Sequence, residues 1–175
     1  MTTTVTTKLN HVEIEAVAGL AQKIQEVREV AATTWRATVD WDSGFRSSAS
    51  VRDFDPVPSD EPSSLGGTDT AANPVEQLLG ALGNCLAVGY AANATMLGVS
   101  IERLSIDLEG ELDLRTFLGL DPDGNAGYDN ITARVHLDSD ATPDQLEQLH
   151  NQVVSTSPVG HTLSRPVPLD IALAG

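Results

Sequence analysis

Cys85 is the residue of this sequence best suited to covalent chemistry, and it is the single cysteine among 175 residues. As a thiolate, a cysteine is a nucleophile that a peroxide can oxidise to sulfenic acid. A chain with one cysteine forms neither an intramolecular disulfide nor a four-thiolate zinc site. Cys85 follows Leu78 by seven residues and Leu82 by three, on an apolar stripe where a cysteine is often an inert small side chain. The residues by themselves leave both interpretations open.

Four further side chains could contribute to a site, and each has a structural alternative. Ser157 precedes Pro158, where a serine commonly caps a helical turn, although His161 four residues on makes a Ser–His nucleophilic pair conceivable. No G-x-S-x-G motif surrounds any serine, which weakens the hydrolase hypothesis. Glu76 is at the N3 position of a predicted helix, where a carboxylate can complete a capping box. Arg46 follows a predicted turn and either favours a nearby thiolate or is a solvated surface arginine.

The histidines and the charge balance exclude other kinds of chemistry and partner. His11, His136 and His150 lie on separate predicted elements without the spacing of metal ligands, so the sequence predicts no metal and no other cofactor. Ten basic against 25 acidic residues give a net charge of −15, which would repel a phosphate backbone and argues against a nucleic-acid partner.

The chain is also expected to stay out of membranes. Its longest apolar stretch, residues 75–99, is interrupted by polar residues at four positions, whereas a membrane span needs about 20 almost uninterrupted apolar residues. Residues 1–8 lack the basic and apolar regions of a secretory signal. We therefore expect a cytoplasmic protein.

Apolar periodicity predicts an α+β protein with one domain over residues 11–175, after a flexible N-terminal tail at residues 1–10. The predicted elements are an N-terminal helix at 11–30, a hairpin at about 35–52, a loop at 53–70, a central helix at about 74–97, strands near 104–114 and 131–137, a helix from 142, and an edge strand at 167–173. The central helix begins at Asn73-Pro74, stops before Gly98 and carries many small residues, so we expect it to be buried.

Two motifs and the order of elements resemble the OsmC/Ohr family of osmotically inducible and organic-hydroperoxide-resistance proteins. The first motif is Gly66-Gly67-Thr68 followed by Asn73-Pro74-Val75-Glu76-Gln77-Leu78-Leu79-Gly80-Ala81-Leu82-Gly83-Asn84-Cys85. The second is Ser157-Pro158-Val159-Gly160-His161-Thr162-Leu163, and the element order agrees from about Trp35 onward. The resemblance implies the OsmC-like fold, with antiparallel sheets packed on a long central helix in an intertwined homodimer.

The resemblance also assigns roles to individual residues. Peroxide-reducing members use a peroxidatic cysteine on the central helix, a resolving cysteine in the later segment, an arginine and a glutamate. Cys85 is in the peroxidatic position, Arg46 is the candidate for the arginine, and the resolving position holds Ser157. Val75 is where the family glutamate usually lies, and Glu76 is one step, about 100°, further around the helix. Glu76 and His161 are therefore candidates only for residues that support the site without touching the reacting atoms.

These observations lead to two functional hypotheses. The first is a thiol-dependent peroxidase of the oxidative-stress type, in which Cys85 reduces an apolar organic hydroperoxide and an external thiol regenerates it, because Ser157 cannot form a disulfide. The alternative is an OsmC-like binding module without turnover, which holds a small apolar ligand at the dimer interface with Cys85 merely lining the pocket. Loss of the second cysteine and of the usual glutamate is the reason for considering it.

Overall fold

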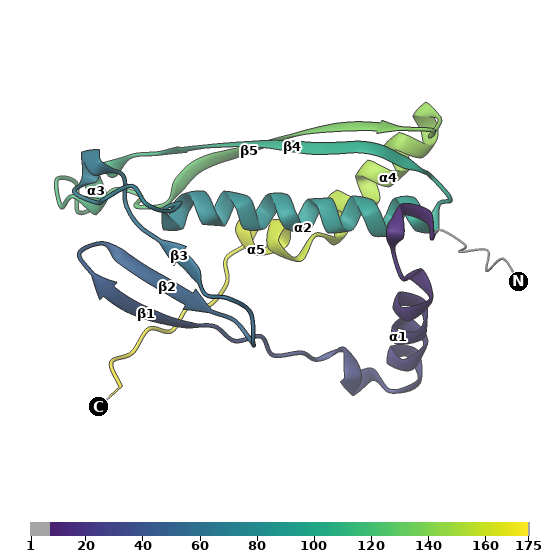
Figure 1. The fold of residues 1–175 in the computed structure, drawn as a ribbon, viewed down its shortest axis with the longest axis horizontal. Coiled ribbons are helices and arrows are strands. Elements are labelled where there is room, and N and C mark those ends of the chain that lie inside the picture. Colours follow the sequence, from purple (N-terminus) through teal and green to yellow (C-terminus); the bar gives the residue numbers. More distant parts are fainter. Residues whose placement is uncertain (1–7, 175) are drawn as a thin grey trace, which may run out of the picture. The chain divides into compact units, whose positions relative to one another are not determined.

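The computed structural model describes residues 8–174, and the fold is α+β, as the sequence predicts. The sequence predicts one domain, and the described residues form two compact units, one of residues 8–14 with 81–174 and the other of Glu15–Gly80. The helices and strands are α1 Ile14–Glu26, β1 Thr38–Ser43, β2 Arg46–Ser50, β3 Val57–Ser59, α2 Pro74–Met96, β4 Ile101–Leu112, α3 Leu114–Phe117, β5 Tyr128–Ser139, α4 Pro143–Thr156 and α5 Pro158–Ser164 (Figure 1). Short 3-10 helices are at Leu9–His11, Arg28–Ala31 and Ser63–Leu65.

The unit Glu15–Gly80 contains most of α1 and a three-stranded antiparallel sheet in the order β1-β2-β3. The turn of the hairpin is completed by Gly44 at a φ of +58°, a conformation that glycine adopts at low cost. Strand β3 lies inside the segment predicted as a loop. The prediction missed it because Pro58 lacks an N–H and is typical of turns, yet β3 is an edge strand, where a proline is tolerated.

Helix α1 is shorter than the predicted helix at 11–30, and none of its residues is buried. It ends at Glu26 because Val27 has extended backbone angles, φ −134° and ψ 90°, and a 3-10 turn follows. Its apolar side chains Val17 and Leu20 are 46% and 53% exposed. The amphipathic pattern therefore predicted the helix, but the described chain does not cover its apolar face.

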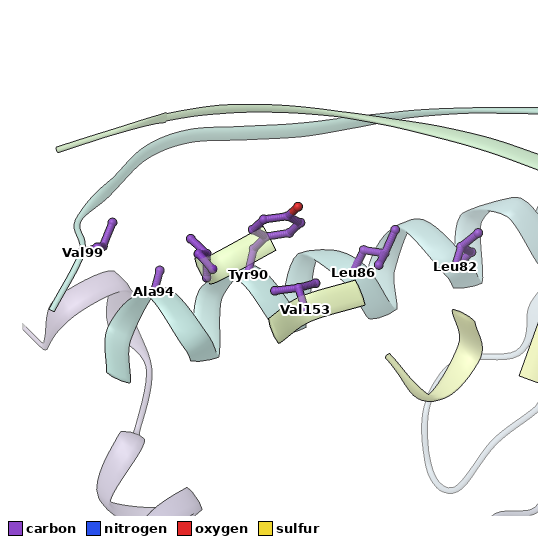
Figure 2. Packing of buried hydrophobic residues seen from close by; sticks show 7 residues of the cluster. Leu82, Leu86, Tyr90, Ala94, Val99 and Val153 are labelled. Carbon is purple, nitrogen blue, oxygen red and sulfur yellow. The ribbon is translucent and has the colours of Figure 1, made fainter. Parts of the chain in front are cut away.

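The other unit is built around α2, with the antiparallel ribbon of β4 and β5 along one side and α4 and α5 on another (Figure 1). The ribbon register pairs Leu104 with Leu137 and Ile106 with Val135. Alternation puts these apolar residues on the same face, where they pack against the buried cluster of α2. Figure 2 shows Leu82, Leu86, Tyr90 and Ala94 in a row along α2; the buried cluster is Leu82, Leu86, Tyr90, Ala94, Val99, Leu149 and Val153.

Helix α2 is buried along one side only. The small and apolar residues predict a buried helix packed on several sides, but Val88 is 70% exposed and Met96 57% exposed. Gly83 and Gly89 explain part of the small-residue content: a Cβ on Gly83 would lie 2.7 Å from Leu108 of β4, and one on Gly89 would lie 3.0 Å from Val153 of α4. Both glycines let a neighbouring element approach the helix backbone.

Both ends of the chain differ from expectation. Residues 1–7 of the predicted tail lie outside the described residues, whereas Asn10 is held in place: its side chain donates to Thr95 Oγ1 and Val99 O and accepts from the Ile101 N–H. The predicted C-terminal strand at 167–173 is wrong for the structure, because this segment has no regular secondary structure. Its alternating apolar side chains are exposed, and a strand needs a neighbouring strand to satisfy its backbone groups.

Candidate functional site

Cys85 lies at the middle of α2, and local signals at both ends of this helix fix its position. At the start, Asn73 and Glu76 form a reciprocal capping box: the Asn73 N–H donates to the Glu76 carboxylate at 2.8 Å, and the Glu76 N–H donates to Asn73 Oδ1 at 2.9 Å. At the end, Gly98 has a φ of +72°, and its N–H donates to Thr95 O while the next N–H donates to Ala94 O. These two bonds are the Schellman pattern that stops a helix.

An apolar cleft of about 470 Å³ lies beside Cys85 in the unit that contains it. Cys85, Val88, Gly89 and Ala92 follow helical spacing, so they share the face of α2 that forms one wall. The opposite wall comes from the end of α4 and the start of α5. The complete lining is Asn84, Cys85, Val88, Gly89, Ala92, Val153, Thr156, Ser157 and Pro158.

Ser157 lies at the junction of α4 and α5, and its position follows from the residue after it. Pro158 lacks an N–H and disfavours a helical conformation in the residue before it, so α4 ends at Thr156 and Ser157 is extended, with ψ of 114°. Ser157 then becomes the N-cap of α5, its Oγ accepting the Gly160 N–H at 3.1 Å. The side chain is 5% exposed.

The structure brings Cys85 and Ser157 together across 72 positions of sequence. The distance from Cys85 Sγ to Ser157 Oγ is 3.3 Å, within hydrogen-bonding range for sulfur, and either atom can be the donor. The cysteine is half-buried and its sulfur is at the cleft wall. The arrangement can hold an apolar molecule next to a thiol that has one hydroxyl partner.

The other predicted site residues have contacts of a different kind. Arg46 forms an ion pair with Asp42 at 3.2 Å and donates to Ser43 Oγ at 2.6 Å, both inside its own hairpin. Glu76 is engaged in the capping box. It lies nine positions before Cys85, which corresponds to about 14 Å along α2 and to opposite sides of the helix. Catalytic participation of either residue stays a prediction.

His161 is half-buried one turn into α5, and its backbone N–H donates to Ser157 O at 2.9 Å. The hydrogen-bond partners of the Ser157 hydroxyl among the described residues are Gly160 and Cys85, so the geometry does not bring the imidazole to the serine. The other three histidines also lie apart, and residues 8–174 contain no group of three or more His, Cys, Asp or Glu side chains placed to hold a metal ion.

Sequence reasoning missed the donor that fixes Ser157 and two polar residues of the cleft. The Gly160 N–H donates to Ser157 Oγ and fixes the serine side chain. A helix-capping serine usually accepts from the N–H three positions later, so the sequence Ser157-Pro158-Val159-Gly160 contains this signal. Asn84 and Thr156 also line the cleft. Nothing in their local sequence distinguishes them from other polar helix residues, so only the packing of α2 against α4 identifies them.

A second polar feature of this unit is the contact between Tyr90 of α2 and His150 of α4. The Tyr90 hydroxyl and His150 Nδ1 are 2.5 Å apart, and Tyr90 is 2% exposed. Burial raises the pKa of the Tyr90 phenol, so this group is a neutral hydroxyl near neutral pH. The contact ties α4 to α2 at the residue next to the cleft residue Gly89, and it therefore helps to hold the two walls together.

The comparison with solved structures supports the fold independently. An OsmC-like protein from Mycoplasma pneumoniae has a TM-score of 0.66 at 18% identity, covering 75% of this chain and 88% of that one. An organic hydroperoxide resistance protein OsmC from Legionella pneumophila has a TM-score of 0.57 at 16% identity, covering 75% and 91%. An organic hydroperoxide resistance protein from Elizabethkingia anophelis has a TM-score of 0.54 at 13% identity, covering 74% and 88%.

Sequence comparisons identify the family. The comparison with curated proteins found no similar sequence. The family model described as OsmC-like protein matches residues 67–172, a segment that includes α2 with Cys85, the β4–β5 ribbon, and α4 and α5 with Ser157. This match covers more than half of the chain and contains every residue of the cleft. The chain therefore belongs to the OsmC-like protein family.

Proposed function

We propose that this protein is a thiol-dependent peroxidase that reduces an apolar organic hydroperoxide at Cys85. The observation that carries the proposal is the position of the Cys85 sulfur in the wall of an apolar cleft, in a member of the OsmC-like family. Two of the similar structures bear the name organic hydroperoxide resistance protein, which connects the fold with oxidative stress. An apolar lining favours a substrate with a hydrocarbon tail over hydrogen peroxide, because burial of that tail stabilises the complex.

The proposed reaction uses one cysteine. The Cys85 thiolate attacks the distal oxygen of ROOH, the O–O bond breaks, and the leaving alkoxide takes a proton to give ROH and a Cys85 sulfenic acid. A small external thiol then displaces water and forms a mixed disulfide with Cys85. A second external thiol releases Cys85 and leaves as the oxidised disulfide. Arg46 is retained in the proposal as the cation that favours the thiolate and orients the peroxide, after exchanging Asp42 for these partners.

The test is the mass of the protein after one equivalent of cumene hydroperoxide. We expect wild-type protein to gain one oxygen, or one adduct of the thiol supplied, at Cys85. The Cys85→Ser variant is the matched control and should keep its mass. The rate with cumene hydroperoxide should exceed the rate with hydrogen peroxide. A wild-type protein whose Cys85 stays reduced under these conditions contradicts the proposal.

A binding module without turnover is the second candidate, and one observation favours it. Arg46 contacts Asp42 and Ser43 of its own hairpin. In this conformation the guanidinium is therefore paired with Asp42, whereas the peroxidase hypothesis requires it at the substrate. Under this alternative the cleft holds a small apolar ligand and Cys85 only lines it. Two results together would favour the binding module. The thiol of Cys85 would not react with a small alkylating reagent across pH 6–9, and an apolar fluorescent probe would bind and be displaced by a bulky alkyl alcohol.

A further inference from the structure

We propose that Ser157 is a positioning residue whose hydroxyl donates a hydrogen bond to Cys85 and stabilises its thiolate form. The inference rests on the proposed function and adds to it a role for the serine where a two-cysteine enzyme would carry its second thiol. Three facts support it: the 3.3 Å distance between Cys85 Sγ and Ser157 Oγ, the burial of the serine, and the Gly160 N–H that occupies one acceptor position of its oxygen.

The direction of the hydrogen bond follows from counting donors and acceptors. A serine hydroxyl has one proton to donate and two lone pairs to accept with. The Gly160 N–H already takes one lone pair, and the buried proton needs an acceptor, because an unsatisfied buried donor is costly. The Cys85 sulfur is the acceptor within reach among the described residues. A thiolate can only accept, so the hydroxyl must donate when the cysteine is ionised.

The geometry favours the ionised sulfur over the neutral one. Hydrogen bonds to charged acceptors are about twice as strong as those between neutral groups, so the bond from Ser157 contributes more when Cys85 is a thiolate. The capping bond from Gly160 also fixes the serine rotamer, which means that the hydroxyl needs no reorganisation to meet the charge. This matters because the other walls of the cleft are mainly apolar and solvate a negative charge poorly.

The experiment measures the rate of Cys85 alkylation by iodoacetamide as a function of pH, without any peroxide. We expect Ser157→Ala to move the midpoint of the rate profile upward by about one pH unit and to slow alkylation near pH 7 about tenfold. Ser157→Thr keeps a hydroxyl and should restore the wild-type midpoint. Thr156→Ala is the matched control, because Thr156 lines the same cleft but its hydroxyl donates to Gln152 O, and its midpoint should stay unchanged.

The absorbance of the thiolate near 240 nm gives a second reading on the same variants, and circular dichroism shows whether each is folded. A Ser157→Ala variant that is folded and keeps the wild-type midpoint overturns the inference. If Ser157→Ala fails to fold, Ser157→Gly, which is tolerated at an N-cap, takes its place with the same expectation. If the midpoint of the alkylation profile depends on Ser157 but the protein does not reduce peroxide, only the proposed function is contradicted. If the protein reduces peroxide but the midpoint is the same in Ser157→Ala, only this inference is contradicted.

Discussion

At residue scale, the proposed chemistry of Cys85 depends on which group position 157 presents to its sulfur. A second thiol there would permit a disulfide, whereas the observed serine offers a hydroxyl at 3.3 Å from the sulfur. The serine therefore removes one route for reducing an oxidised cysteine and leaves the sulfur in contact with an open cleft. A small thiol entering the cleft would then reach the same atom that reacts with the proposed hydroperoxide.

Replacing Ser157 by cysteine should restore the missing disulfide. The Oγ already lies 3.3 Å from Cys85 Sγ, and a disulfide needs the two sulfurs at about 2.05 Å, which a modest side-chain rotation can supply. One equivalent of organic hydroperoxide should therefore yield a disulfide between positions 85 and 157, with one ROH and one water released. Mass spectrometry should show the loss of two hydrogens.

Ser155→Cys is the control for this experiment. Ser155 is exposed and its hydroxyl donates to Gln152 O, so a cysteine there should gain an oxygen or a thiol adduct independently of Cys85. An intramolecular disulfide in Ser155→Cys, or none in Ser157→Cys after oxidation of Cys85, would show that the observed distance does not govern the chemistry.

At element scale, the segment between β3 and α2 is organised by one buried carboxylate, Asp60. Its oxygens accept from the hydroxyl and N–H of Thr68, from the hydroxyl and N–H of Thr70, and from the Glu61 N–H. The Thr68 hydroxyl is the largest of the influences that hold the pKa of Asp60 well below its usual range, while burial acts in the opposite direction. These bonds close the glycine-containing segment that the sequence analysis treated only as a loop.

Asp60→Asn should lower the midpoint of thermal unfolding. The amide NH₂ of asparagine would face hydroxyl and N–H donors that Asp60 now satisfies, so at least one donor would lose its acceptor. Because the folded pKa of Asp60 is depressed, its stabilising effect is present above the unfolded value of about 4 and is lost as pH falls through the lower folded value. The difference from wild type should therefore be full near pH 7 and shrink below about pH 4.

Asp69→Asn is the matched control for this measurement. Asp69 is exposed in the same segment and has a φ of +56°, a conformation that asparagine also tolerates. Calorimetric scans at pH 7 and pH 3 should show a lower midpoint for Asp60→Asn at both pH values, with the smaller difference from wild type at pH 3, because the folded pKa of Asp60 lies below pH 3. Equal midpoints for Asp60→Asn and wild type at pH 7 would mean that the carboxylate does not stabilise the segment.

At the scale of the whole molecule, both units carry apolar surface that the described chain does not cover. Val88 on α2 is 70% exposed, Trp41 on β1 is 73% exposed, and Leu169 near the C-terminus is 82% exposed. Such surface in a soluble monomer would be unusual, and isologous contact between two copies is the commonest way to bury it. Among residues 8–174, no helix has the length and apolar character that crossing a bilayer requires.

We therefore predict a homodimer in solution, consistent with the assembly that the family resemblance implies. Sedimentation equilibrium at micromolar concentration should give twice the chain mass of 18.5 kDa. Val88→Glu should shift the equilibrium toward monomer, because it places a charge on apolar helix surface that a second copy would bury. Thr132→Glu, on the polar face of the β4–β5 ribbon, should leave the mass unchanged. A wild-type monomer at these concentrations would contradict the prediction.

The sequence determined the elements whose signals are local. The Asn73-Pro74 start and the Gly98 stop of α2 are set by backbone hydrogen bonds within a few residues, and Thr142-Pro143 likewise starts α4 with a capping box. The resemblance added Cys85 and position 157 as related sites, which no periodicity could connect. The local pattern also predicted a C-terminal strand that the structure does not contain. Alternation of apolar residues indicates a strand but does not show whether a partner strand is available.

Only the tertiary structure decided what surrounds Cys85. Contacts between residues 72 positions apart, such as Cys85 with Ser157, depend on how closely α4 packs against α2, and that distance is set by the glycine at position 89 facing Val153. The same packing leaves an apolar cleft instead of a filled core and turns a serine that caps α5 into a hydroxyl in contact with sulfur. A linear sequence specifies the residue types for this site, but close packing of distant segments specifies the distances on which their chemistry depends.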